Sequence, residues 1–160
     1  MRPGRRGRQR RGYEFLVRWY PGPVKKRSTG HREVEHTADW ELEVWAPNMA
    51  ALLEEAARGM FELMNVELAN GPRQRRRIVL DAGDLEQLLV EFLDELLYLG
   101  ESEELGCDRY RLTVEGCHLE AMVEGVPIVA QSKEIKAVTY HRLEVDETED
   151  GLETRIVFDV

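Results

Sequence analysis

The stretch "DWELEVWAPNMAALLEEAARGMFELMNV" (residues 39–66) decides the fold class, because it passes from a strand period to a helix period. Residues 39–46 alternate between apolar and other side chains, which is typical of a strand with one buried face. Pro47 ends the alternation, and Asn48 is a good N-cap for the helix that follows. The buried strand face would hold Trp40, Leu42, Val44 and Ala46, and the helix stripe Leu52, Leu53, Ala56, Ala57, Met60, Phe61 and Met64.

A second strand and helix follow downstream. The segment "RQRRRIVLDA" (73–82) is typical of a strand with an arginine-rich start. Asp84 and Gln87 form a capping-box-like pair, and leucines at helical spacing then continue toward Gly100, where we expect the helix to end.

The C-terminal half predicts strands joined by tight turns. Residues 109–116 and 118–125 would form a hairpin around Gly116. Residues 134–147 and 152–160 would form another, joined across Asp150-Gly151. About six strands and two helices with mostly hairpin connections predict an α+β domain, in which two amphipathic helices pack on a largely antiparallel sheet.

The charge of the chain divides it into two parts. Residues 1–30 carry ten Arg or Lys and one acid, whereas residues 31–160 carry 12 basic and 30 acidic groups. We interpret residues 1–30 as a basic arm, either a disordered tail or upstream sequence read from a misplaced start codon, and residues 31–160 as a single domain. An acidic domain repels the phosphate backbone and disfavours binding of nucleic acid. Direct RNA contact is therefore expected only through residues 1–30.

The composition also limits the cellular compartments in which we expect the protein. There is no apolar run long enough to span a membrane, and the N-terminus lacks the apolar region of a secretory signal. Cys107 and Cys117 form neither a disulfide framework nor a CxxC pair. We therefore expect reduced thiols in a cytoplasmic protein.

No nucleophile elbow, P-loop, dinucleotide fingerprint or HExxH motif occurs, so an autonomous enzyme is the least favoured class. Three features remain: "EHTAD" (35–39), the final Asp159-Val160, and "SKEIKAVTYH" (132–141). The last holds Lys133 and Lys136, the only lysines after residue 30. Taken alone, each feature also fits a solvated strand end or edge.

If the strands that carry Asp39 and Asp159 lie side by side, their carboxylates and the Val160 carboxylate converge. Such crowding requires protonation or a cation. Oxygen ligands suit Ca²⁺ or Mg²⁺ better than zinc. The pattern alone does not decide whether these groups meet.

The chain resembles the archease family. The segments "VEHTAD", "AALLEEAARGMFELM", "DLEQLLVEFLDELLYL", "EIKAVTYHRLEV" and "VFDV" occur in the family's order and cover about residues 32–160. The resemblance implies an α+β fold and a non-catalytic activator of the GTP-dependent RNA ligase of tRNA splicing. Such an activator promotes ligase guanylylation and multiple turnover. The alternative is a chaperone-like partner of an RNA-modifying methyltransferase.

The resemblance also implies roles for individual residues. Asp39, Asp159 and Val160 match the family's metal ligands, with Ca²⁺ the expected ion and Mg²⁺ or Mn²⁺ as alternatives. Lys136 matches a lysine needed for ligase activation, and His36 and His141 fall inside matching motifs with a supporting or purely structural role. Two segments depart from the family pattern: residues 1–30 have no counterpart, and "GVPIVAQSK" (125–133) is shorter and less polar.

Overall fold

The computed structural model describes residues 29–34 and 39–160, so the expectations for the basic arm and for His36 lie outside the described residues and stay predictions. The described part contains two helices and nine strands. In chain order the elements are β1 (Gly30–Val34), β2 (Trp40–Ala46), α1 (Met49–Leu63), β3 (Val66–Leu68), β4 (Gln74–Asp81), α2 (Leu85–Glu103), β5 (Leu105–Glu115), β6 (His118–Gln131), β7 (Ala137–Val138), β8 (Val145–Thr148) and β9 (Gly151–Asp159).

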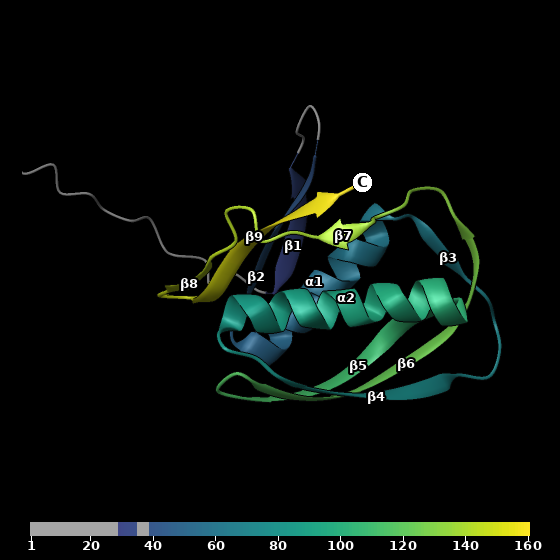
Figure 1. The fold of residues 1–160 in the computed structure, drawn as a ribbon, viewed down its shortest axis with the longest axis horizontal. Coiled ribbons are helices and arrows are strands. Elements are labelled where there is room, and N and C mark those ends of the chain that lie inside the picture. The colour runs from purple at the N-terminus through teal and green to yellow at the C-terminus, as the bar shows by residue number, and fades with distance from the viewer. Residues whose placement is uncertain (1–28, 35–38) are drawn as a thin grey trace, which may run out of the picture.

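The strands form two antiparallel sheets with the two helices between them (Figure 1). The first sheet has the order β1-β2-β9-β7, and β8 also pairs with β9. In the second sheet β6 pairs with β3, β4 and β5. The α+β class is confirmed, but the single sheet of about six strands is replaced by two sheets, because each helix has apolar residues to bury on both sides.

Helix α1 forms as the sequence predicts. The Asn48 side chain accepts a hydrogen bond from the Ala51 backbone N–H at 2.9 Å, which satisfies one donor of the first turn. The helix packs on β1 and β2 on one side and on β5 on the other. It ends at Leu63, three residues before the end of the quoted stretch, where Asn65 adopts a left-handed φ of 49°.

Helix α2 also begins where expected but runs past Gly100. Asp84 Oδ1 accepts from the Gln87 N–H at 2.7 Å, and Gln87 Oε1 accepts from the Gly83 N–H at 2.9 Å. The predicted end near Gly100 was wrong. The helix continues to Glu103 and closes at Glu104, whose φ of 52° is left-handed.

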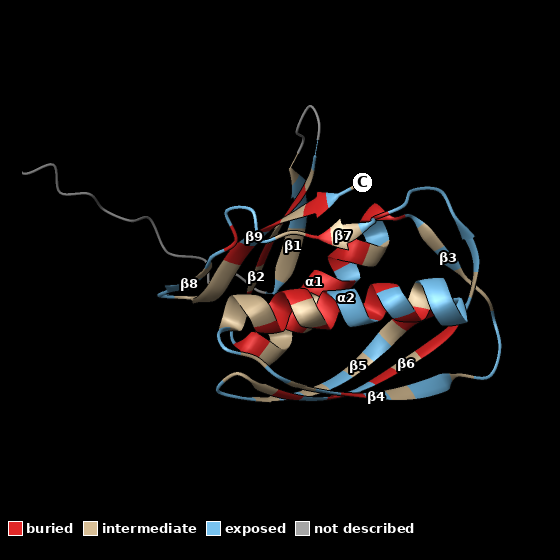
Figure 2. Cartoon of the chain, viewed as in Figure 1, coloured by how far each residue is buried: buried red, intermediate tan, exposed pale blue. Residues whose placement is uncertain are grey.

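The core lies between the helices and the inner faces of both sheets, as the buried residues in Figure 2 show. Leu42 and Val44 of β2 are fully buried, so the predicted alternation has the correct phase. Phe158 of β9 is fully buried beside them in the core. Neither helix is long and apolar enough to cross a membrane.

Several strands differ from the sequence-based expectation. The predicted strand 134–147 is broken into β7 and β8 by a turn in which Leu143 N–H bonds Tyr140 O and Arg142 has a φ of 51°. Strands β1 and β3 were missed, since both are short and lack a clear alternation. The hairpins β5–β6 and β8–β9 form at the predicted turns.

Cys107 is buried and Cys117 is half-buried, and the two form no disulfide with each other. Burial raises the pKa of the Cys107 thiol to about 12. Cys107 therefore behaves as a small apolar core residue.

His31 fastens the edge strand β1 to α1. Its Nδ1 lies 2.7 Å from Glu55 Oε1 and its Nε2 lies 2.8 Å from Glu62 Oε2. Only the doubly protonated imidazolium can donate to both carboxylates. Burial disfavours this charged form, but the hydrogen bonds and charges of the two glutamates outweigh burial and raise the pKa of His31 above its usual 6.5.

The raised pKa predicts a pH-dependent contribution to stability. Because the folded state binds the proton more tightly, this contribution is complete below pH 6.5 and is lost as the pH rises through the folded-state pKa. Urea titrations of the wild type and of His31→Gln should therefore differ in unfolding free energy at pH 5.5 and converge toward pH 9. A difference that does not change with pH would contradict the prediction. The comparison of the two proteins cancels the His118–Asp81 pair, which is present in both.

Candidate functional site

The candidate site lies at one end of the first sheet, where β9 ends between the start of β2 and the start of β7 (Figure 1). Trp40 is the Cα partner of Phe158 in the β2–β9 pair. The β2–β9 ladder ends at this pair, and Asp39 and Asp159 are the next residues beyond it on the two segments. Opposed residues on adjacent strands have Cβ atoms about 5 Å apart and on the same face. The observed register therefore brings together the two segment ends that carry Asp39 and Asp159, and the meeting of their carboxylates stays a prediction.

Asp39 and Asp159 are both exposed at this edge. Among the described residues, no basic side chain forms an ion pair with either carboxylate. Two carboxylates brought together at one sheet end would repel each other, and a bound cation would relieve that repulsion.

Lys136 is fixed against the last residues of β9. Its backbone N–H donates to Asp159 O at 2.8 Å, and its ammonium Nζ lies 3.4 Å from the Val160 main-chain oxygen. The next residue, Ala137, pairs with Asp159 across the β7–β9 ladder. The structure thus places Lys136 beside Asp159 and Val160, on the opposite edge of β9 from Asp39.

A pocket of about 270 Å³ opens on the outer face of the sheet, beside Asp39. Its other lining residues come from β2, β9 and the turn after β7: Glu41, His141, Arg142, Arg155 and Val157. Thr139 holds this turn through its N–H and its Oγ1, which both donate to Val157 O, at 3.0 and 2.9 Å. His141 therefore shares a pocket with Asp39.

Sequence reasoning missed Arg142 and Arg155. Arg155 Nη1 lies 3.4 Å from the nearly buried Glu41 carboxylate, and Arg142 lies in the turn that interrupts the predicted strand. Alternation already placed Glu41 on the outer face. Only the pairing of β2 with β9, however, shows that Arg155 comes next to it.

The chemistry of the donor set fits a hard cation. Two carboxylates and the Val160 main-chain oxygen are all oxygen donors, the kind that Ca²⁺ and Mg²⁺ prefer. Within residues 29–34 and 39–160, three or more His, Cys, Asp or Glu side chains nowhere gather into a metal-holding group. Any ion here would thus be held by two side chains together with main-chain oxygens, and the ion remains a prediction.

Comparisons with known proteins agree with one another. Residues 31–160 match the archease protein family. Protein archease of Methanosarcina acetivorans is 34% identical over 136 residues, which cover 79% of this chain and 93% of the relative. Protein archease of Methanopyrus kandleri is 34% identical over 74% of this chain and 90% of the relative.

Solved structures show the same fold. A crystal structure from Thermotoga maritima, named an archease and possible chaperone, has a TM-score of 0.60 at 27% identity. The match covers 81% of this chain and 96% of the other. Protein 1598 of Methanobacterium thermoautotrophicum has a TM-score of 0.61 at 24% identity, with coverage of 82% and 99%. On its sequence and its fold, this chain belongs to the archease family.

Proposed function

We propose that this protein activates the GTP-dependent RNA ligase of tRNA splicing, without chemistry of its own, by promoting ligase guanylylation and multiple turnover. Membership of the archease family supports the proposal. The observation that carries it is the pairing of β9 with β2 on one edge and with β7 on the other, which brings the segments that hold Asp39 and Lys136 to the end of β9. The family resemblance implies metal binding by Asp39, Asp159 and Val160, and ligase activation by Lys136.

A divalent cation, most simply Ca²⁺, would be held by Asp39, Asp159 and the Val160 main-chain oxygen. When bound, it would offset the repulsion among the converging oxygens and tie β9 to the start of β2. The protein's own groups would then present an ordered, charged edge, with the Lys136 ammonium on one side. A cationic nucleotide cleft in the ligase would attract this acidic edge, and the attraction would fix the orientation of docking.

The alternative is a chaperone-like partner of an RNA-modifying methyltransferase. The name "possible chaperone" on the related Thermotoga maritima structure favours it. This alternative requires the protein to suppress methyltransferase aggregation in the absence of GTP. The ligase assay below separates the two, because a chaperone for another enzyme leaves ligase turnover unchanged.

The first prediction concerns turnover. The protein is added in substoichiometric amounts to its cognate ligase with GTP and two tRNA halves, and joined tRNA is counted per ligase. We expect many turnovers with the wild type and about one with Asp39→Asn or Asp159→Asn, because each variant removes one ligand charge at constant shape. Asp146→Asn, an exposed acid on β8 of the same sheet, is the matched control and should retain activity. Wild-type turnover in both site variants would refute the role of the site.

The second prediction concerns cation binding without the ligase. A ligand that binds only the folded state stabilises it, by about 2.7 kcal/mol at one hundred times Kd. Ca²⁺ should therefore raise the melting temperature of the wild type and of Asp146→Asn, but not of Asp159→Asn. Mg²⁺ and Mn²⁺ titrations identify the preferred ion. Equal shifts in all three proteins would place the ion elsewhere.

The third prediction concerns Lys136. Lys136→Met should lower ligase turnover at least roughly tenfold, because the variant loses the ammonium beside Val160, a loss of more than about 1.4 kcal/mol in activation. Its melting temperature should stay close to wild type, since Lys136 is exposed. Lys133→Met is the matched control. Lys133 lies 4.8 Å from the Trp40 ring centroid and outside the proposed ligand set. Equal losses in both variants would contradict a specific role for Lys136.

A further inference from the structure

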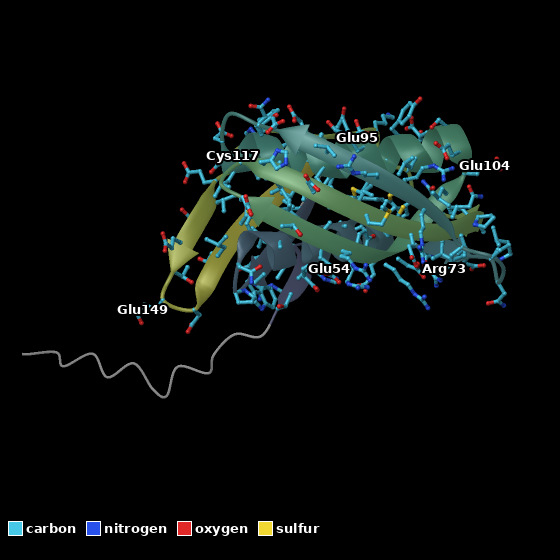
Figure 3. The ribbon with its side chains drawn as sticks, turned by 90° about the horizontal axis from the view of Figure 1, so that it is seen from below. Glu54, Arg73, Glu95, Glu104, Cys117 and Glu149 are labelled. Carbon is cyan, nitrogen blue, oxygen red and sulfur yellow. The ribbon has the colours of Figure 1, made fainter. Side chains whose placement is uncertain are left out.

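The outer face of the second sheet carries a cluster of arginines on a chain that is acidic overall. Figure 3 looks onto this sheet from below, with Cys117 near one end and Arg73 near the other. Strands β4 and β5 flank β6, and their outward side chains include Arg75 and Arg77 on β4 and Arg109 and Arg111 on β5. We call these four residues the arginine face. All four are exposed.

The register arranges the arginine face as two rows across the sheet. In one row Arg75 and Arg109 both pair with Glu124. In the other, Arg77 and Arg111 both pair with Met122. Residues two apart on a strand lie about 7 Å apart, and β4 and β5 are separated by two strand spacings of about 4.8 Å each. The Cα atoms of the four arginines therefore lie at the corners of a rectangle of about 7 by 10 Å.

The acidic groups on this face do not neutralise it. Arg75 Nε lies 2.7 Å from Glu124 and Arg109 Nη1 lies 4.0 Å from the same carboxylate, so one negative charge serves two arginines. Arg77 makes only a 3.7 Å contact to the exposed Glu120. Arg111 has no acidic partner among the described residues, and Met122 occupies the position between it and Arg77.

A shallow hollow of about 750 Å³ lies over this face. Arg75, Arg109, Arg111, Met122 and Glu124 line it, together with Arg58 of α1. The Arg58 guanidinium carbon lies 5.5 Å from the centroid of the Tyr110 ring at the rim, and this guanidinium is paired with Glu54 at 2.7 Å. The lining is cationic and contains one carboxylate.

The chemistry of this face fits phosphate better than a protein surface. Guanidinium groups bind phosphate through two parallel N–H donors, which is why arginine predominates where phosphate is recognised. Stable protein interfaces need buried aromatic or aliphatic anchors at their centre. Here the central apolar side chain is Met122, 36% exposed, and the Tyr110 ring lies beneath Arg58.

We propose that the arginine face binds the phosphate backbone of RNA, with a phosphate seated over Met122 between Arg77 and Arg111. Resting on the proposed function, the RNA is the tRNA that the ligase joins. The face would hold it without reading its sequence. This differs from the expectation that RNA contacts only residues 1–30, which followed from net charge and not from where the charges lie.

The test is a titration of an unmodified tRNA transcript with the full chain, followed by fluorescence anisotropy at several salt concentrations and without ligase. Arg77→Gln/Arg111→Gln should weaken binding roughly 10- to 100-fold near 0.1 M salt and lower the slope of log K against log salt by about 1.5 to 2. Glu124→Gln should tighten binding, since it frees Arg75 and Arg109. A merely structural role for the Glu124 pairs predicts no such gain.

The matched control is Arg32→Gln/Lys133→Gln, which removes the same two charges from other surfaces. Every variant keeps residues 1–30, so any contribution from that segment cancels. Equal losses in the control and the arginine-face variant, or no loss in either, would overturn the proposal. An unchanged RNA titration together with weaker binding to the ligase protein alone would also overturn it and identify a protein contact.

This outcome is separable from the proposed function. The RNA titration contains no ligase, so a failure of the protein to stimulate turnover leaves the titration result standing. Conversely, stimulation with an unchanged titration would retain the activator and remove the RNA face.

Discussion

The pairing of β9 with strands on both of its edges is the interaction on which the rest of the structure depends. On one edge β9 pairs with β2 from Trp40 to Ala46, and on the other with β7 and β8. The fully buried Phe158 and Ile156 hold β9 in this position, and a register slip of one residue would turn both to the solvent. The β2–β9 register brings the start of β2 beside the end of β9, and the β7–β9 pairing places Lys136 there. Core packing and the candidate site thus both depend on β9.

Signals from neighbouring residues were sufficient to predict the features that depend only on neighbouring residues. The caps at Asn48 and Asp84, the alternation of β2 and the turn at Gly116 each depend on a few neighbouring residues, and all were predicted. The class of the domain followed from them. The end of α2 was predicted too early, at Gly100, because a glycine is tolerated inside a helix that is held by packing. The left-handed residue that ends α2 is Glu104.

Long-range arrangement could not be predicted in the same way. Nothing near Asp39 in the sequence shows that the end of β9 lies beside the start of β2, or that Arg155 approaches Glu41. The division of the strands into two sheets could not be predicted either. The sequence pattern of an amphipathic helix is similar whether one sheet or two sheets pack against it. The family resemblance supplied the residue set, and the β2–β9 register shows that the segment ends that carry Asp39 and Asp159 lie together. Net charge does not show where charges lie for a related reason, since it averages the acidic groups of the domain with the arginine face of the second sheet.

The β2–β9 ladder has a further consequence, for the order of events during synthesis. Glu41 and Arg155 are 114 residues apart, so the two strands that build the candidate site are made at almost opposite ends of the described domain. Closing a loop of this length is entropically expensive, and folds rich in such distant contacts form slowly. A ribosome-bound chain can complete the second sheet while β2 still exposes an open edge. The site therefore assembles only when β9 is released, and a chain truncated before β9 would leave that edge free to pair with other strands.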